Sequence, residues 1–282
     1  MITEGTGTRC LSPFLTLNLT GHERMDIQTT TANGILTIAF NRPERKNAIT
    51  GAMYQSMADA LVAAESDSTV RAIVITGTPD IFTAGNDLDD FLKNGPVPGK
   101  SDANRPVYQF MRALAGASKP VVAAVTGAAI GIGTTLLMHC DLVYAADKAK
   151  FSMPFVQLGL CPEFASSLQF PAIAGHPRAA EKLLLGEAFS AQEAFEMGLI
   201  SRILPADELL PFAMAQAAKL VALPASSVRA TKSLMKRSKQ APIEAAIAAE
   251  NELFGAMLQA PEAKEAFTAF FEKRKPDFSK FA

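Results

Sequence analysis

The sequence contains few of the residues that mark metal-binding or redox proteins. Its 282 residues include three cysteines and three histidines. They are scattered along the chain, at Cys10, Cys140, Cys161, His22, His139 and His176. No pair of cysteines has the spacing of a zinc or dithiol motif, and the histidines do not cluster. We therefore predict no metal site, and the small, odd number of cysteines indicates a reducing compartment.

An excess of charge of one sign and a long apolar run are also lacking. The 27 basic and 28 acidic residues give a formal net charge of -1, which does not favour binding to nucleic acid or to a membrane surface. No run approaches the roughly 20 apolar residues of a membrane span, and no secretory signal is evident at the N-terminus. We expect a cytoplasmic protein with no nucleic-acid or membrane partner.

The chain divides into three segments by composition and periodicity. Residues 1–24 are rich in Thr and Gly without a sustained period, and Met25 opens a stretch that resembles a normal protein start. We therefore predict that residues 1–24 are a tail outside the fold. Residues 25–205 alternate short apolar runs with helical segments, which is typical of an α/β core. Residues 206–282 are helical throughout.

The expected elements follow from apolar periodicity, turn residues and caps. We expect strands at 35–40, 70–76, 121–125, 142–145 and 151–153. We expect helices after Thr50, over 105–117, from Thr134, after the Ser190 capping box to Gly198, and at 207–221, 225–238, 243–259 and 261–273. Residues 80–105 have the glycines and prolines of a loop.

Two Gly-rich loops follow strands and can present backbone N–H groups to an anion. Residues 81–88 read IFTAGNDL, and residues 125–133 read VTGAAIGIG and open a helix. A helix N-terminus has unpaired N–H groups and partial positive charge, which favours a developing oxyanion. Each loop alone is more often simple turn chemistry. The second is not a dinucleotide fingerprint, because Leu136 stands where the third glycine belongs.

A third segment, LGLCPEFASS at residues 158–167, contains an isolated acid. Pro162 suits the first turn of a helix, which predicts that Glu163 lies near a helix N-terminus. Two interpretations of Glu163 are open on these residues alone. It is either a favourable charge–dipole contact or a functional carboxylate.

Together the three segments resemble the enoyl-CoA hydratase/isomerase (crotonase) superfamily over residues 26–280. Supporting segments in the same order are 41–49, 119–125, 140–145, 198–200 and 270–278. The resemblance implies an α/β fold with a crotonase-like spiral of β-β-α repeats, followed by a C-terminal helical region that builds a homotrimer or hexamer. It also implies an acyl-CoA substrate and no cofactor, because coenzyme A is part of the substrate.

The resemblance assigns residues to the site by position. The thioester oxygen is expected in an oxyanion hole made by the backbone N–H groups of Asn86 and Ile132. The residues expected to contact the substrate are Ala84, Asp87, Leu88, Thr135, Phe155 and Phe164. Those expected to bind the coenzyme A head group are Arg45, Lys46, Ala48 and Lys273.

The acid/base residues discriminate among members of this superfamily. Similar hydratases have two glutamates, at positions that Thr135 and Phe155 occupy here. Glu163 instead falls where isomerases of the family have a single catalytic glutamate. The resemblance therefore implies isomerisation of 3-enoyl-CoA to trans-2-enoyl-CoA with Glu163 as acid/base. The alternatives are a hydratase, hydrolase or dehalogenase reaction, or a non-catalytic member that binds coenzyme A. Near-neutral charge does not support the RNA-binding role of some relatives.

Overall fold

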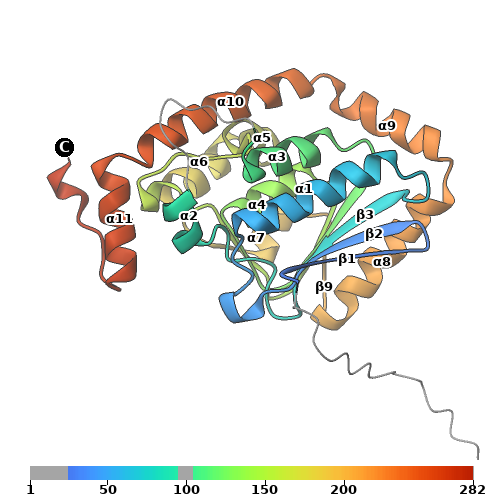
Figure 1. Ribbon diagram of the computed structural model, residues 1–282, viewed down its shortest axis with the longest axis horizontal. Coiled ribbons are helices and arrows are strands. Elements are labelled where there is room, and N and C mark those ends of the chain that lie inside the picture. Colours follow the sequence, from blue (N-terminus) through green and yellow to red (C-terminus); the bar gives the residue numbers. More distant parts are fainter. Residues whose placement is uncertain (1–24, 95–103, 282) are drawn as a thin grey trace, which may run out of the picture.

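The computed structural model describes residues 25–94 and 104–281, and its centre is a mainly parallel sheet (Figure 1). Within these residues six strands lie in the order β1-β2-β3-β4-β6-β9, with only β1 and β2 antiparallel. Their bounds are Ile27–Ala32, Ile35–Phe40, Ala72–Thr76, Val121–Val125, Leu142–Ala146 and Arg202–Leu204. A second sheet joins β5 (Ala128–Ile130), β7 (Lys150–Ser152) and β8 (Phe189–Ser190). The predicted α/β class is confirmed, and the tail predicted over residues 1–24 lies outside the described residues.

The middle strands are continuous apolar runs because helices cover both faces of the sheet. Every residue of β3 and of β4 is buried. Helices α1 (Gly51–Ser66) and α3 (Pro106–Gly116) pack together on one face, and α8 (Ala206–Ala222) lies on the other (Figure 1). Small residues Ala213 and Ala217 let α8 approach the sheet closely. The core therefore lies on both sides of β3 and β4.

Three local sequence signals act at helix ends as predicted. The Thr50 hydroxyl accepts from Met53 N at the start of α1. Ser190 and Glu193 form the predicted capping box at the start of α7 (Ala191–Glu196), and Gly198 has the positive φ expected of a residue just past a helix end. Helices α5 and α6 span Ser166–Ala174 and His176–Leu185.

Two local predictions were wrong in detail. Residues 80–105 were expected to be a loop, but they include α2 (Leu88–Asn94). The Asp87 carboxylate caps this helix by accepting from the N–H groups of Asp89 and Asp90. The glycines and prolines that follow in the sequence favoured a loop, so the prediction did not include this helix. The helix expected from Thr134 begins earlier, as the single turn α4 (Ile132–Thr135), and continues as a 3₁₀ turn over Leu136–His139.

The C-terminal helices form an arc along one edge of the molecule (Figure 1). They are α9 (Ala225–Arg237), α10 (Gln240–Met257) and α11 (Pro261–Phe271), close to the predicted ranges.

The other short 3₁₀ turns of the described residues span Pro43–Arg45, Val156–Leu158 and Phe278–Lys280. Among the described residues no single helix has the length and apolarity of a membrane span, although α8 and α9 pass that test as a pair bent by 109°.

Candidate active site

The two Gly-rich loops lie side by side, after the neighbouring strands β3 and β4. Thr83 N donates to Ala128 O, and Ile130 N donates to Thr83 O, both at 3.0 Å. Gly85 has a φ of +86°, and a Cβ there would lie 2.7 Å from the Ile130 carbonyl oxygen. Only glycine fits this conformation and this contact, so the close approach of the loops depends on Gly85.

The Asn86 N–H is left free by the hydrogen bonds on either side of it. Ile49 N donates to Gly85 O at 2.8 Å, and Asp87 N donates to Ile49 O at 2.9 Å. This parallel bridge turns the peptide N–H of Asn86 away from Ile49. Within the described residues the Asn86 N–H donates to no acceptor. It is therefore available to a ligand.

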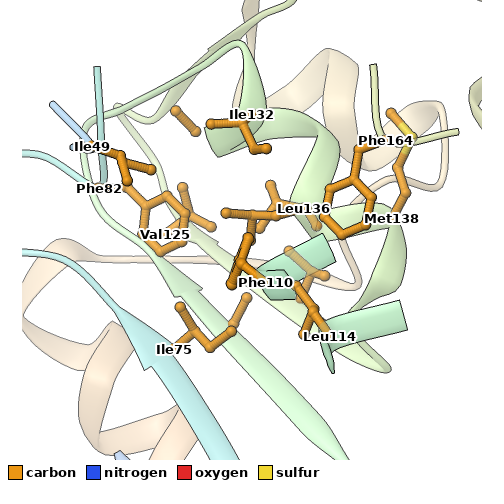
Figure 2. Packing of buried hydrophobic residues seen from close by; sticks show 14 of the residues in the cluster. Ile49, Ile75, Phe82, Phe110, Leu114, Val125, Ile132, Leu136, Met138 and Phe164 are labelled. Carbon is orange, nitrogen blue, oxygen red and sulfur yellow. The ribbon is translucent and has the colours of Figure 1, made fainter. Parts of the chain in front are cut away.

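The Ile132 N–H is free for a different reason. Ile132 is the first residue of α4, so its N–H has no acceptor within the helix. Elsewhere in the described part of the chain it has none either. The Ile132 side chain is fully buried beside Phe82 and Leu136 (Figure 2). Packing of the Ile132 side chain thus fixes the position of its peptide group, and the peptide N–H has no acceptor in the described chain.

A pocket opens next to Asn86, between α1, α2, α3 and α10. Its apolar lining includes Tyr54, Phe91, Val107, Tyr108, Met111 and Phe254, and its polar lining includes Asn86 and Glu163. The Tyr54 hydroxyl lies 2.5 Å from Asn86 Oδ1, which fixes the Asn86 side chain. Such a concave, mostly apolar pocket with a few polar groups suits a small-molecule chain ending near one reactive centre.

Glu163 lines this pocket and is almost completely buried. The residue is 5% exposed, and its Oε1 is buried without a hydrogen-bond partner among the described residues. Burial, and secondarily the charge of Glu250, raise the pKa of Glu163 to about 8. A carboxyl in this state can take up and give back a proton near neutral pH.

Pro162 does not lie in the first turn of a helix, so that prediction was wrong, although Glu163 lies close to the N-terminus of α5. Helix α5 begins at Ser166, and Glu163 precedes it in a turn in which Phe164 and Ala165 have φ values of 59° and 56°. The acid that caps α5 is Glu250 of α10, which accepts from Ala165 N and Ser167 N. The charge–dipole interpretation of Glu163 therefore fails, because Glu250 has that role.

Among the residues expected to contact substrate, three lie beside the Asn86 N–H. Asp87 lines the pocket, but its carboxylate accepts from Arg42 at 2.7 Å and caps α2. Leu88 begins α2 and packs against the core. Ala84 N donates to Lys46 O at 3.0 Å, which fixes the loop. These residues shape the loop that presents the N–H group.

The other three are buried. Thr135 is fully buried, and its Oγ1 has no partner among the described residues. Phe155 is buried with its ring 6.4 Å from that of Phe254 in the pocket wall. Phe164 has no exposed surface, and its ring packs in the core near Phe110 and Leu136 (Figure 2). Like Thr135 and Phe155, it does not line the pocket and stays a predicted substrate contact.

Among the residues expected to bind coenzyme A, Arg45 already has acidic partners for its positive charge. Its guanidinium lies 2.7 Å from the Asp89 carboxylate and 3.5 Å from that of Asp87. Lys46 is exposed in a left-handed conformation, and the Ala48 carbonyl accepts from Arg42. Lys273 is exposed just past α11 on the C-terminal arc.

Several pocket residues were missed from the sequence. Tyr54, Tyr108, Met111 and Phe254 were assigned only to helices, where aromatic and Met residues usually belong to the core. Glu250 left a usable signal, since it interrupts an apolar stripe of helical spacing, Ile243, Ile247, Phe254 and Leu258. A carboxylate at a core position of a helix indicates a specific partner.

Known proteins similar to this chain identify its family. Residues 30–280 match the family model described as enoyl-CoA hydratase/isomerase. The chain is 32% identical over 244 residues to 2,3-dehydroadipyl-CoA hydratase of Escherichia coli K12, covering 86% of this chain and 94% of that protein. It is 37% identical over 225 residues to enoyl-CoA delta isomerase 2 of Rattus norvegicus, covering 79% and 57% respectively. The crystal structure of enoyl-CoA hydratase/isomerase from Pseudoalteromonas atlantica T6c superposes with a TM-score of 0.85 at 37% identity, over 90% of this chain and all of that one (100%).

Proposed function

The chain belongs to the enoyl-CoA hydratase/isomerase family, and on that premise we propose that it converts 3-enoyl-CoA to trans-2-enoyl-CoA with Glu163 as the acid/base. It is an acyl-CoA enzyme of this family. The observation that carries the finer proposal is the Glu163 carboxyl, which has a buried, unpaired oxygen among the described residues and lines the pocket with Asn86. The names of its relatives include both hydratases and isomerases, so the chemistry of the site must decide between them.

The proposed reaction moves one proton and one double bond. The Glu163 carboxylate takes a proton from C2 of the acyl chain, and the electron pair delocalises onto the thioester oxygen. The N–H groups of Asn86 and Ile132 stabilise that oxygen as negative charge develops on it. The protonated Glu163 then gives the proton to C4, the electron pair returns, and the double bond lies between C2 and C3. One carboxyl serves both steps because C2 and C4 lie on either side of C3.

The other acids that line the pocket are held by partners. Asp87 is paired with Arg42, and Asp90 accepts from Gly51 N at 2.8 Å. The positions of the two hydratase glutamates are occupied by Thr135 and Phe155, neither of which can activate water as a base. This arrangement supports a single-carboxyl reaction over hydration.

A substrate panel tests the proposal against its alternatives. The wild-type enzyme is expected to convert 3-enoyl-CoA thioesters to 2-enoyl-CoA. In D₂O the C2 proton should return at C4 when transfer is direct, and deuterium should enter C4 to the extent that the Glu163 proton exchanges with solvent between the two steps. Crotonyl-CoA, simple acyl-CoA and halogenated acyl-CoA substrates test for hydratase, hydrolase and dehalogenase activity in the same assay. Efficient hydration of crotonyl-CoA, or turnover of another class without isomerisation, would contradict the proposal.

We also propose that the region 206–282 assembles a homotrimer or hexamer. Its helices carry exposed apolar side chains on the arc, namely Leu234, Met235, Leu253, Phe270 and Phe271. An exposed apolar surface of this kind is typical of an interface between chains. Light scattering at micromolar concentration should report three or six chains. A mass of one chain across the concentration range would rule this assembly out.

A further inference from the structure

The turn that carries Glu163 has a conformation that the local sequence does not favour. Phe164 and Ala165 are consecutive, neither is glycine, and both have a positive φ. L-amino acids with side chains avoid this region, so two such residues in succession persist only when their surroundings hold them. Ser166 contributes locally, because its hydroxyl and its N–H both donate to the Glu163 carbonyl, at 2.7 and 3.2 Å. The remaining restraints come from elements distant in sequence.

Glu250 holds the turn from the C-terminal arc. It is 7% exposed, and its carboxylate accepts from Ala165 N at 2.5 Å, from Ser167 N at 3.0 Å and from the Ser167 hydroxyl. These partners are 85 and 83 residues away in sequence. Three donors on one carboxylate fix the path of the chain directly after Glu163.

His139 restrains the same turn from the core side. Its Nε2 lies 2.8 Å from the Phe164 carbonyl oxygen, and its ring stacks on the Phe164 ring with centroids 3.8 Å apart. Burial lowers the pKa of His139 to about 3, so the ring is neutral at working pH. The peptide between Phe164 and Ala165 is therefore held through its oxygen by His139 and through its N–H by Glu250.

We propose that Glu250 is a positioning residue, which holds the 163–167 turn so that the Glu163 carboxyl faces the pocket and keeps a negative charge behind it. The inference rests on the proposed function, in which Glu163 is the acid/base. Glu250 does not line the pocket and does not act on substrate itself, and its role is exerted through Glu163.

The charge of Glu250 has a separate consequence from its position. The two carboxyls are close enough that Glu250 contributes to the raised pKa of Glu163, after burial. Burial raises the pKa of Glu250 as well, but its hydrogen bonds from Ala165 and Ser167 act in the opposite direction. Glu163 Oε1 has no donor in the described chain, so Glu250 is the more acidic of the two carboxyls. The other titratable groups facing Glu163 from neighbouring elements are Tyr54, Tyr108, Cys161, Arg105 and Asp90. The two tyrosines and Cys161 have raised pKa values and stay neutral, so they do not replace the charge of Glu250.

Two substitutions separate position from charge. Glu250→Gln keeps the size but removes the charge and leaves one acceptor oxygen, and we expect kcat to fall about 10-fold. The midpoint of the rise of kcat/KM with pH should also move down by about one unit, because the base form of Glu163 becomes easier to reach. Glu250→Asp keeps the charge but is one methylene too short to reach both N–H groups. It should lower kcat while the midpoint stays high. Glu252→Gln, an exposed residue on the same helix, is the matched control and should change neither quantity.

A measurement that needs no activity keeps this inference separate from the proposed function. The Glu163 carboxyl can be titrated by ¹³C NMR with labelled glutamate, its signal identified by its loss in Glu163→Gln. A lower Glu163 midpoint in Glu250→Gln supports the inference even if the enzyme isomerises no 3-enoyl-CoA, in which case only the proposed function fails. An unchanged Glu163 midpoint and an unchanged kcat in Glu250→Gln, with only a lower melting temperature, would overturn it. If Glu250→Gln does not fold, an unchanged kcat in Glu250→Asp has the same meaning.

Discussion

The two sides of the pocket are built from different parts of the chain and from different chemical groups. On one side, the N–H group of Asn86 belongs to backbone whose place is set by hydrogen bonds to the neighbouring loop, which carries the N–H group of Ile132. On the other side, Glu163 offers one side-chain carboxyl on a turn that Glu250 of α10 holds. A donor made of backbone is fixed once the loops are in register, whatever its side chain. A carboxyl depends on its own identity and on the groups that aim it.

The largest effect is expected on the carboxyl side. Glu163→Gln keeps the size of the side chain and removes the proton acceptor, so isomerisation should fall at least about 10²-fold in kcat. Binding of a coenzyme A thioester should persist, because the two N–H donors are unaffected. Single-turnover kinetics and calorimetric titration measure the two quantities separately. A Glu163→Gln variant that isomerises at near the wild-type rate would show that the carboxyl is not required. The proposed mechanism would then be wrong.

A smaller effect is expected when the register of the backbone side is disturbed. Gly85→Ala places a Cβ 2.7 Å from the Ile130 oxygen at a φ of +86°, so the two loops must move apart. The Asn86 N–H then shifts from its place, and kcat should fall about 10-fold or more, because a lost oxyanion donor costs about 10²–10³. Gly116→Ala is the control, since a Cβ there meets no atom within 4 Å and φ is ordinary. Equal rates for the two variants would show that the spacing of the two loops does not determine the position of the Asn86 N–H.

The smallest effect is expected from the side chain of a donor residue. Ile132→Val removes one buried methylene and should lower the free energy of unfolding by about 0.5–1.5 kcal/mol. The rate should hardly change, because the peptide N–H stays in place at the start of α4. Chemical denaturation and steady-state kinetics provide the two numbers. A large loss of rate with little loss of stability would mean that the side chain, rather than the backbone, contributes to the reaction.

The backbone side was also the more predictable one from sequence. Gly85 and Gly131 lie in Gly-rich loops after plain apolar runs, so the sequence predicted both loops and the strands before them, and the resemblance implied that the two loops act together. The place of Glu163 was predicted as a pocket position only through resemblance, and the helical setting of Pro162 was wrong. No propensity indicates that Phe164 and Ala165 adopt a left-handed conformation, because tertiary contacts impose it. The partnership of Glu163 with Glu250 joins residues far apart in sequence, which single-sequence patterns do not report.

The distance along the chain between the 163–167 turn and Glu250 also sets an order of assembly during synthesis. Ala165 leaves the ribosome 85 residues before Glu250. At about 5–20 residues per second, both Gly-rich loops are synthesised several seconds before α10. In a nascent chain the two proposed oxyanion donors therefore precede the residue that holds Glu163, the proposed acid/base. A product truncated before α10 retains the strands but has no Glu250, so the last quarter of translation completes the site.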